Sequence, residues 1–346
     1  MREKGNSPAD LLPQNILSPA YHFIAIYCYF SRMLVYWYRY RITAKNRIVR
    51  SLFMSKRIVP EIPDVSKRIR IIIDSDAANE IDDLYAITMA ISHPERFDIV
   101  GFIATHYAQW AGPDSTKISY NLLLELLENA GKAGAYPVKM GSHPMQYANT
   151  YNDSEGVDFI IENARASSPE DPLWVIAIGA ATNLACALLK APDIIPNVRY
   201  IFHARSEETW PERSKQFNVY GDIIAAKSLL ESEVPLIWFD TGTHLYAHYD
   251  TTREKLAPIN KLGKYLHDYR DRNPYFALPD KGFFDMADFA YLIDPPACQW
   301  EIIDAPEMNR FMYFDHNHKH GQMLRVYDVD VEKTWEIFYR GIERLS

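Results

Sequence analysis

Short β-rich apolar runs alternate with segments of helical periodicity from Arg68 onward, and this alternation constrains the fold more than any other feature. It predicts an α/β fold in which a mostly parallel open sheet has helices on both faces. Ligands bind such sheets at the carboxyl ends of the strands, so the residues that follow each strand are the first site candidates. The expected strands are 68–74, 98–106, 136–140, 173–178, 198–203 and 235–240, and the expected helices are 82–92, one through 122–127 that ends at 131, 157–166, 182–190, 223–230 and 331–345.

The organisation of the chain is expected to be simple. Because no clear boundary follows residue 66, the sequence predicts one domain over residues 67–346, preceded by an extension and linker over residues 1–66. The chain has only three cysteines and no Cys-x-x-Cys pair. This excludes a disulfide-stapled secreted domain and a cysteine-rich zinc module, and it indicates a reducing compartment. We therefore expect a cytoplasmic protein.

The charge of the chain is unevenly distributed. Residues 1–57 hold ten Lys and Arg against two Asp and Glu, a charge of +8, so the remaining residues carry −16 of the total of −8. Proteins that bind nucleic acid concentrate positive charge on the folded body. An acidic body instead favours metal cations and small polar substrates, and we expect no nucleic-acid partner.

The N-terminal segment 21–38 is strongly aromatic and about the length of a bilayer span, and five basic residues follow it between positions 39 and 50. This resembles a membrane anchor, although His22, Ser31 and Arg32 interrupt it. Two other interpretations stay open: residues before Met54 are a non-native or dispensable extension, or the segment is a surface helix. A membrane-anchored protein is therefore the alternative to a freely cytoplasmic one.

The sharpest motif is the run from Asp74 to Asp83, which reads Asp-Ser-Asp-Ala-Ala-Asn-Glu-Ile-Asp-Asp between the first strand and the first helix. So many carboxylates at one strand end repel each other unless a partner neutralises them. A hard divalent cation with a preference for oxygen ligands, such as Ca²⁺, is a natural partner. The alternative is a solvated loop whose acidic residues cap a helix.

This run resembles the N-terminal signature of the inosine–uridine-preferring nucleoside hydrolase family, which has Asp-x-Asp, a short spacer and Asp-Asp after the first strand. Three later elements resemble that family's motifs in the same order: Thr182-Asn183 after a strand, Phe217-Asn218 before a helix, and Asp285 at the start of a late helix. The four motifs together are specific, and they extend over roughly residues 68–305.

The resemblance implies a single-domain nucleoside hydrolase-like fold and a Ca²⁺ ion held by Asp76, Asp83, Asp285 and a backbone carbonyl near Ile178. It implies that Asp76 is the general base on a metal-bound water, which attacks the anomeric carbon of an oxocarbenium-like ribosyl centre. Related proteins commonly form dimers or tetramers, so a homo-oligomer is expected.

The resemblance also implies roles around the sugar. Asp82 would accept a hydrogen bond from a ribose hydroxyl, and Asn218 would orient the sugar. Asp74 would be a supporting residue, and Gln109 stands where the family has an active-site asparagine.

Three departures separate this sequence from typical members. Five residues separate Asp76 from Asp82 where the common form has three, and the sequence resembles a divergent branch with this longer spacer. Gln216 replaces a glutamate, which weakens a contact to a sugar hydroxyl. Phe284 stands where inosine–uridine-preferring members have the histidine that protonates the departing base. A phenyl ring can stack on a base but cannot donate a proton.

Other residues are candidates for the leaving-group side. His106, His203 and His244 each follow a strand or turn and are weighed as proton donors against a packing role. Tyr107 and Trp110 can form an aromatic wall for a base, although such residues more often pack.

Two further segments carry weaker signals. The long stretch that holds Arg205 and Trp210 is a candidate substrate lid. The histidine-rich run 315–320 favours a polar loop between two strands over a metal tract.

The sequence therefore predicts a Ca²⁺-dependent hydrolase that cleaves the N-glycosidic bond of a ribonucleoside or a related ribosyl compound. The alternative is a metal-dependent protein that binds a sugar or nucleoside with little or no turnover. Neither a dinucleotide-binding Gly-x-Gly-x-x-Gly motif nor the Gly-x-Ser-x-Gly elbow of serine hydrolases is present.

Overall fold

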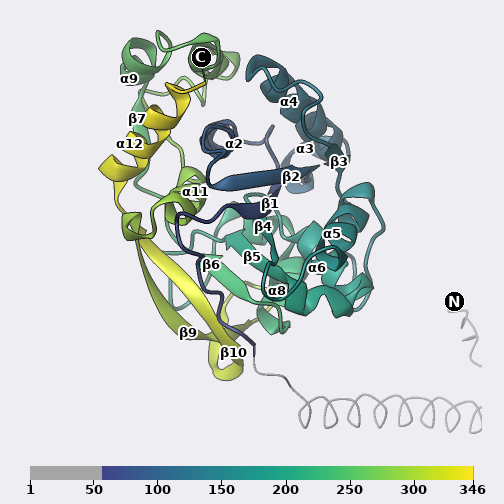
Figure 1. The fold of residues 1–346 in the computed structure, drawn as a ribbon. Coiled ribbons are helices and arrows are strands. Elements are labelled where there is room, and N and C mark those ends of the chain that lie inside the picture. Colours follow the sequence, from purple (N-terminus) through teal and green to yellow (C-terminus); the bar gives the residue numbers. More distant parts are fainter. Residues whose placement is uncertain (1–56, 346) are drawn as a thin grey trace, which may run out of the picture. The chain divides into compact units, whose positions relative to one another are not determined.

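The computed structural model describes residues 57–345, and the segment 21–38 lies outside this range (Figure 1). Its centre is an eight-stranded sheet in the order β3-β2-β1-β4-β5-β6-β10-β9, in which all neighbours are parallel except β9 and β10. The strands of this sheet are β1 Ile69–Ser75, β2 Phe97–Ala104, β3 Val138–Met140, β4 Leu173–Ala177, β5 Val198–His203, β6 Leu236–Phe239, β9 Cys298–Met308 and β10 Phe314–Val329.

Helices cover both faces of the sheet, as the alternating sequence pattern predicts. The principal helices are α2 Asp82–Ile91, α4 Ser115–Asn129, α5 Glu155–Arg165, α6 Thr182–Lys190, α8 Ile223–Glu231, α10 Lys261–Tyr269, α11 Met286–Ile293 and α12 Val331–Ile342. Three short helices, α3 Ala108–Ala111, α7 Phe217–Gly221 and α9 Tyr249–Thr251, and a ribbon of β7 Tyr246–His248 with β8 Asp280–Gly282 complete these elements.

The side chains of the central strand β1 alternate between the two faces of the main sheet. Ile71 and Ile73 belong to the core beneath α2, α4, α11 and α12, whereas Ile72 belongs to the core beneath α5, α6 and α8. Successive side chains of a strand point to opposite faces, so a strand buried on both sides is apolar throughout. The run Ile-Ile-Ile at 71–73 therefore places β1 in the middle of the sheet.

The C-terminal hairpin corrects one expectation. Residues 315–320 do not form a polar loop between two strands, because they lie within β10, which pairs with β9. The strand pairing is irregular there, and His316 and His318 are exposed. A hairpin that extends beyond the sheet leaves its side chains in water, so polar residues are compatible with strand structure at this position.

Residues 57–66, which the sequence assigned to a linker, pack on the folded body. Arg57 is buried and donates hydrogen bonds to the carbonyls of Leu229, Leu230 and Ser232 at the C-terminal end of α8. A cation at the end of a helix satisfies carbonyls that have no partner within the helix. Among residues 57–345, no helix has the length and hydropathy needed to cross a membrane.

Candidate active site

A cavity of about 570 Å³ opens beside the carboxyl ends of β1, β4 and β5. Eight of the ten residues to which the family resemblance gives a site role line it: Asp76, Asp82, Asp83, Ile178, Gln216, Asn218, Phe284 and Asp285. The other lining residues are Asn79, Glu80, Trp110, His203, Arg205, Phe217, Asn273, Tyr275 and Phe276. This is the place at which open α/β sheets bind their ligands.

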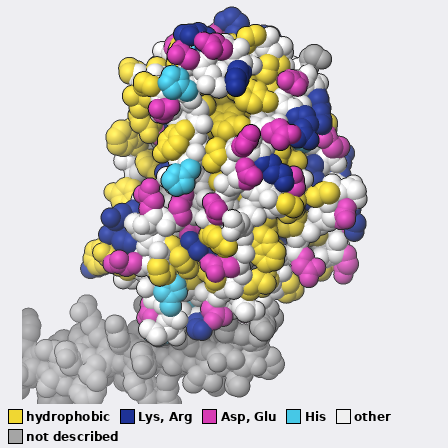
Figure 2. Space-filling model, turned by 90° about the vertical axis from the view of Figure 1, so that its left-hand side faces the viewer, with side chains coloured by type: hydrophobic (Ala, Val, Ile, Leu, Met, Phe, Trp, Pro, Cys, Tyr) yellow, Lys and Arg dark blue, Asp and Glu magenta, His cyan; other side chains and the backbone are white. Residues whose placement is uncertain are grey.

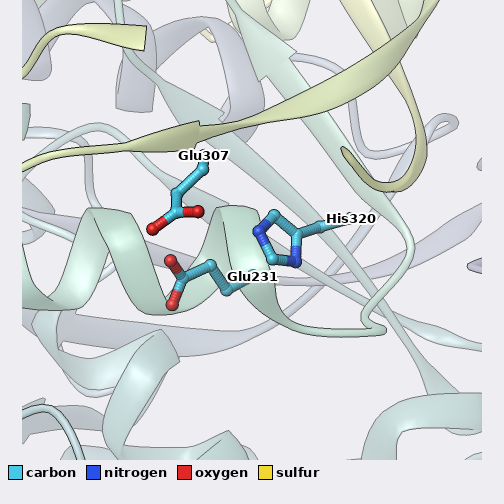
Figure 3. A group of neighbouring side chains, drawn as sticks. All are labelled: Glu231, Glu307 and His320. Atoms are coloured by element: carbon cyan, nitrogen blue, oxygen red, sulfur yellow. The ribbon is translucent and has the colours of Figure 1, made fainter. Parts of the chain in front are cut away.

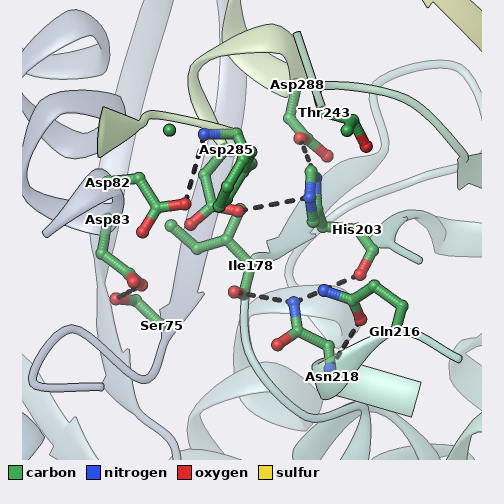
Figure 4. A network of polar contacts seen from close by, with 12 residues as sticks. Ser75, Asp82, Asp83, Ile178, His203, Gln216, Asn218, Thr243, Asp285 and Asp288 are labelled. Carbon is green, nitrogen blue, oxygen red and sulfur yellow. Dashed lines mark hydrogen bonds and ion pairs between the residues drawn. The ribbon is translucent and has the colours of Figure 1, made fainter. Parts of the chain in front are cut away.

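Three carboxylates meet at the bottom of this cavity. Asp82, Asp83 and Asp285 each present an oxygen within 4.8 Å of the others, and all three side chains are buried (Figure 4). Asp82 and Asp83 form the first turn of α2, whereas Asp285 precedes the first turn of α11. Since α2 and α11 pack against each other, their N-terminal ends bring together acids that are about 200 positions apart in the sequence.

The surroundings of these acids favour a bound cation. Burial and repulsion among the carboxylates raise the pKa values of Asp76, Asp83 and Asp285 well above the usual range of aspartate. A divalent ion would remove that repulsion and restore the charged form of each group. The donor set of several carboxylates and a backbone carbonyl therefore fits a hard cation such as Ca²⁺.

Hydrogen bonds fix the orientation of the individual acids. The Ser75 hydroxyl donates to Asp83 Oδ1 at 2.5 Å. The Phe284 amide donates to Asp82 Oδ2 at 3.2 Å, while Asp82 Oδ1 is buried and has no hydrogen-bond partner among the described residues. Asp82 therefore has one oxygen held by the protein and one left for a ligand.

The ends of β4 and β5 form the opposite wall. The Asn218 side-chain amide donates to the carbonyl of Ile178 at 3.0 Å and to the carbonyl of His203 at 3.2 Å. Gln216 caps α7 by accepting hydrogen bonds from the amides of Asn218 and Val219. A carbonyl oxygen has two lone pairs, so this contact leaves Ile178 able to accept a second partner.

His203 connects the two acids at the start of α11. Its Nδ1 lies 2.6 Å from Asp288 Oδ2, and its Nε2 lies 3.4 Å from Asp285 Oδ1. All three side chains are buried, and Figure 4 shows the imidazole between the two carboxylates. Of the three histidines considered as proton donors, His203 lines the cavity and also holds Asp285 in place.

The other two histidines lie elsewhere. His106 is buried and its Nε2 lies 2.7 Å from the Thr182 hydroxyl, and burial lowers the pKa of His106 to about 4. His244 is exposed. Neither residue lines the cavity, so the structure favours a packing role for His106.

Asp74 and Gln109 also lie outside the cavity lining. Asp74 is buried behind the site, where the Asn183 side-chain amide donates to both carboxylate oxygens at 3.1 and 3.2 Å. Burial raises the pKa of Asp74 to about 7. The side chain of Gln109 lies against Gly221. Asp74 thus supports the strand end from behind, whereas Gln109 does not reach the cavity.

The outer part of the cavity is aromatic and basic, and the sequence indicated only part of it. Arg205 lies over the ring of Phe284, with 3.8 Å between the guanidinium carbon and the ring centroid. Lys281 is buried and lies 2.6 Å from Glu80 Oε2. Asn273, Tyr275 and Phe276 were not predicted because their segment follows no strand of the main sheet. The only sequence feature that could have indicated this segment is the Asn-Pro-Tyr-Phe run shortly before Phe284, because Asn-Pro is typical of a loop and two aromatic residues follow it.

A second group of possible metal ligands lies outside the lining of this cavity. Glu231, Glu307 and His320 each present an atom within 4.8 Å of the others (Figure 3). Lys227 already contacts Glu231, Glu307 and the carbonyl of Met308. One ammonium group therefore already lies between the two glutamates and offsets part of their negative charge.

The face of the body drawn in Figure 2 carries mixed charges. Lys and Arg side chains are scattered among Asp and Glu and do not gather in one continuous stretch. The expectation that the protein has no nucleic-acid partner stays a prediction.

Comparison with known proteins identifies the family of the chain. The family model described as inosine-uridine preferring nucleoside hydrolase matches residues 71–337. An uncharacterized protein of Schizosaccharomyces pombe is 28% identical over 219 residues, which are 56% of this chain and 67% of that protein. Probable uridine nucleosidase 2 of Arabidopsis thaliana is 27% identical over 232 residues, which are 58% of this chain and 69% of that protein.

Solved structures show the same fold at lower sequence identity. A plant nucleoside hydrolase has a TM-score of 0.64 and 19% identity, over 81% of this chain and 99% of its own. A purine-preferring ribonucleoside hydrolase from Gardnerella vaginalis has a TM-score of 0.65 and 20% identity, over 80% of this chain and 98% of its own. Because the family model extends over most of the described domain and these folds agree, the chain belongs to the inosine-uridine preferring nucleoside hydrolase family and is a hydrolase.

Proposed function

We propose that this protein hydrolyses the N-glycosidic bond of a ribonucleoside or related ribosyl compound and that it depends on Ca²⁺. The observation that carries the proposal is the meeting of buried carboxylates from α2 and α11 in a cavity that is also lined by the amide side chains of Gln216 and Asn218. A buried group of acids without a counter-charge is unfavourable, and its place at the strand ends is where substrates of this fold class bind.

The proposed Ca²⁺ ligands are the carboxylates of Asp76, Asp83 and Asp285 and the carbonyl of Ile178. All four residues line the cavity. The bound ion would supply Lewis-acid chemistry, which makes a water more acidic and holds ribose hydroxyls. Asp82 is assigned to the sugar because its unpartnered oxygen suits a ribose hydroxyl. Asn218 and Gln216 are assigned to the far side of the sugar.

Asp76 is the proposed general base. Its carboxylate accepts a proton from the attacking water, and the water oxygen forms a bond to the anomeric carbon. The bond between that carbon and the base nitrogen breaks, and its electron pair leaves with the base. The base then takes up a proton from water and Asp76 returns its proton to the solvent, so the products are ribose and the free base.

The identity of the base is open between two classes. One similar protein is named a probable uridine nucleosidase, whereas a protein of the same fold is named purine-preferring. Phe284, Tyr275 and Phe276 offer stacking surface to either class.

A second candidate function is that of a nucleoside- or sugar-binding protein with little turnover. The observation that favours it is Phe284, which lines the cavity and has no proton to donate. In this case the metal and sugar contacts would be kept, and the bond to the base would stay intact.

We also propose that the catalytic domain, predicted at residues 67–346, includes the packed residues 57–66. A homo-oligomer, either a dimer or a tetramer, and a cytoplasmic location remain predictions, with membrane contact through residues 21–38 as the alternative.

The proposal is tested by release of free base from a panel of purine and pyrimidine ribonucleosides, with and without Ca²⁺. Full-length protein and the Asp76→Asn variant are compared. Release that requires both Ca²⁺ and Asp76 supports the hydrolase mechanism. Nucleoside binding without base release, with Ca²⁺ still raising the melting temperature, supports the binding protein instead.

A further inference from the structure

We infer that Arg205 is a catalytic residue that stabilises the negative charge on the departing base by contact from its guanidinium group. This inference rests on the proposed function, because it concerns the bond that the proposed reaction breaks. It explains how the base can leave although Phe284 cannot donate a proton.

The guanidinium group is available to a ligand. It lies 3.8 Å from the centroid of the Phe284 ring and lines the cavity. Among residues 57–345 it forms no hydrogen bond and no ion pair. A guanidinium that stacks through its face on an aromatic ring keeps its N–H donors free at the edge. These donors can therefore approach a base bound beside Phe284.

The backbone around Arg205 is held firmly. Arg205 has a positive φ of 37°, which is uncommon outside glycine. The amides of Ala204 and Arg205 both donate to the carbonyl of Phe239, at 2.7 and 2.9 Å. Strained conformations of this kind persist where the surrounding structure fixes them, and they cluster at functional sites.

The next residue strengthens this arrangement. The hydroxyl of Ser206 donates to Asp240 Oδ1 at 2.5 Å, and Arg325 donates to Asp240 Oδ2 at 2.6 Å. Both Asp240 and Ser206 are buried. An anchored backbone limits the positions that the Arg205 side chain can reach, so its charge is preorganised over the ring.

The ring of Phe284 lies close to one glycine, and its backbone lies close to another. A Cβ atom added to Gly282 would lie 2.1 Å from the ring, and one added to Gly242 would lie 2.6 Å from the carbonyl oxygen of Phe284. The two glycines thus allow a close approach that any larger residue would prevent. Phe284 and Arg205 therefore form a rigid aromatic and cationic wall.

Lys281 is the other cation near this ring, with its ammonium nitrogen 5.2 Å from the centroid. It is buried and already paired with Glu80 at 2.6 Å. Lys281 is thus held in a close ion pair, whereas Arg205 acts on Glu80 only through its charge and forms no ion pair among residues 57–345. Arg205 is the stronger candidate for contact with a ligand.

The chemistry follows from the permanent charge of arginine. Arginine keeps its proton at all physiological pH values, so Arg205 stabilises an anion without transferring a proton. As the bond to the anomeric carbon breaks, the electron pair moves onto the base, which leaves as an anion and is protonated by water afterwards. The proton of the attacking water goes to Asp76. The preferred substrates are bases with a carbonyl oxygen or unprotonated ring nitrogen that faces Arg205.

The test compares two leaving groups on one sugar. Full-length wild-type protein and the variants Arg205→Gln and Arg205→Lys are assayed with the best ribonucleoside of the panel and with p-nitrophenyl riboside, whose phenolate leaves readily without assistance. For Arg205→Gln we expect kcat on the nucleoside to fall on the order of 100-fold or more and kcat on the p-nitrophenyl compound to fall less than about tenfold. Arg205→Lys should recover part of the loss, because it keeps the charge.

Arg213 provides a matched control. It belongs to the same long segment and lies 4.7 Å from the ring centroid of Tyr313, but it does not line the cavity. Arg213→Gln should leave both rates unchanged. Equal losses on both substrates in Arg205→Gln, or a change in KM alone, would overturn the inference, provided that the variant's melting temperature matches that of the wild type.

The two proposals fail in different ways. If the wild-type protein cleaves neither substrate, the proposed hydrolase function fails, and the assignment of Arg205 fails with it. If the wild-type protein cleaves both and Arg205→Gln behaves as the wild type does, the hydrolase function stands and the assignment of Arg205 is wrong.

Discussion

The backbone amide of Phe284 donates a hydrogen bond to Asp82 Oδ2 at 3.2 Å, which links two residues 202 positions apart. One end of this contact is a carboxylate of the buried acidic group, and the other is the backbone of the residue whose ring lies under Arg205. The orientation of one carboxylate oxygen therefore depends on the same backbone that places the aromatic ring. The other oxygen of Asp82 has no hydrogen-bond partner among the described residues and is the one that we assign to the substrate.

Asp82 should contribute to binding of the transition state through a ribose hydroxyl. A hydrogen bond to a charged group is typically worth about 1.5–3 kcal/mol, so Asp82→Asn should lower kcat/KM by roughly 10- to 100-fold. The measurement uses ribonucleosides and their 2′- and 3′-deoxy analogues. With the analogue that lacks the contacted hydroxyl, the variant and the wild type should have similar rates. Equal losses with every analogue would contradict this role.

Removing a carboxylate from the group of Asp82, Asp83 and Asp285 should raise the melting temperature without Ca²⁺ and lower it with Ca²⁺. Without the ion, Asp285→Asn relieves repulsion among buried acids, and the variant should melt at a higher temperature than the wild type. With Ca²⁺ the order should reverse, because an ion at 100 times its Kd stabilises the wild type by about 2.7 kcal/mol. Thermal denaturation in EGTA and in Ca²⁺ measures both effects. A Ca²⁺ effect of the same size in both proteins would argue against Asp285 as a ligand.

His106 should give the stability a dependence on acid pH. Burial lowers its pKa in the folded state to about 4, whereas an exposed histidine has a pKa near 6.5. Between these values the unfolded chain binds a proton that the folded protein does not, so stability falls as the pH falls from about 6.5 to 4. In His106→Gln this loss should be smaller by up to about 3 kcal/mol.

Urea denaturation at several pH values measures that difference. The exposed His244 provides the control, and His244→Gln should follow the wild-type curve. If His106→Gln and the wild type lose stability in parallel, the histidine is not held neutral in the fold.

Gly282 should be required for the position of Phe284. A methyl group at residue 282 would collide with the phenyl ring, so Gly282→Ala should cost about 1–3 kcal/mol of stability and displace the ring. In a double variant with Phe284→Ala, this cost should largely vanish, because the colliding atoms are gone. Chemical denaturation of the four proteins gives the coupling energy. If Gly282→Ala costs as much stability in the Phe284→Ala background as in the wild type, the methyl group does not act through a collision with the ring.

Arg57 should stabilise the domain from outside its predicted boundary. Its guanidinium holds carbonyls at the end of α8, so Arg57→Ala should lower stability by at least about 2 kcal/mol. Arg68 forms an exposed ion pair with Asp98, and Arg68→Ala should cost less than about 1 kcal/mol. Equal effects would mean that residues 57–66 contribute little to the domain.

The sequence predicted the parallel strands β1 to β6 and the acidic part of the site because both depend on local patterns, but it did not predict β9 and β10. Runs such as Ile71–Ile73 indicate a strand buried on both faces, and Asp82 and Asp83 begin the helix that comes after a short loop. The position of Asp285 at the start of α11 was also predicted, through the family resemblance.

The aromatic side of the site could not be predicted in the same way. Phe284 was predicted through the family resemblance and Arg205 as part of a candidate lid, but Tyr275 and Phe276 come from a segment whose position depends on tertiary packing and not on strand periodicity. Gln109 shows the same limit, because a short helix after β2 directs its side chain toward Gly221. The run 315–320 looked like a loop because its composition is polar, although an exposed hairpin accepts such residues.

The pairing of α2 with α11 has a consequence for synthesis of the protein. Asp76, Asp82 and Asp83 leave the ribosome early, whereas Asp285 is added about 200 residues later. Until then the nascent chain lacks one proposed ligand and the wall that carries Phe284. Since domains fold as units once their distant contacts can form, a high-affinity metal site should be acquired only by the nearly completed chain.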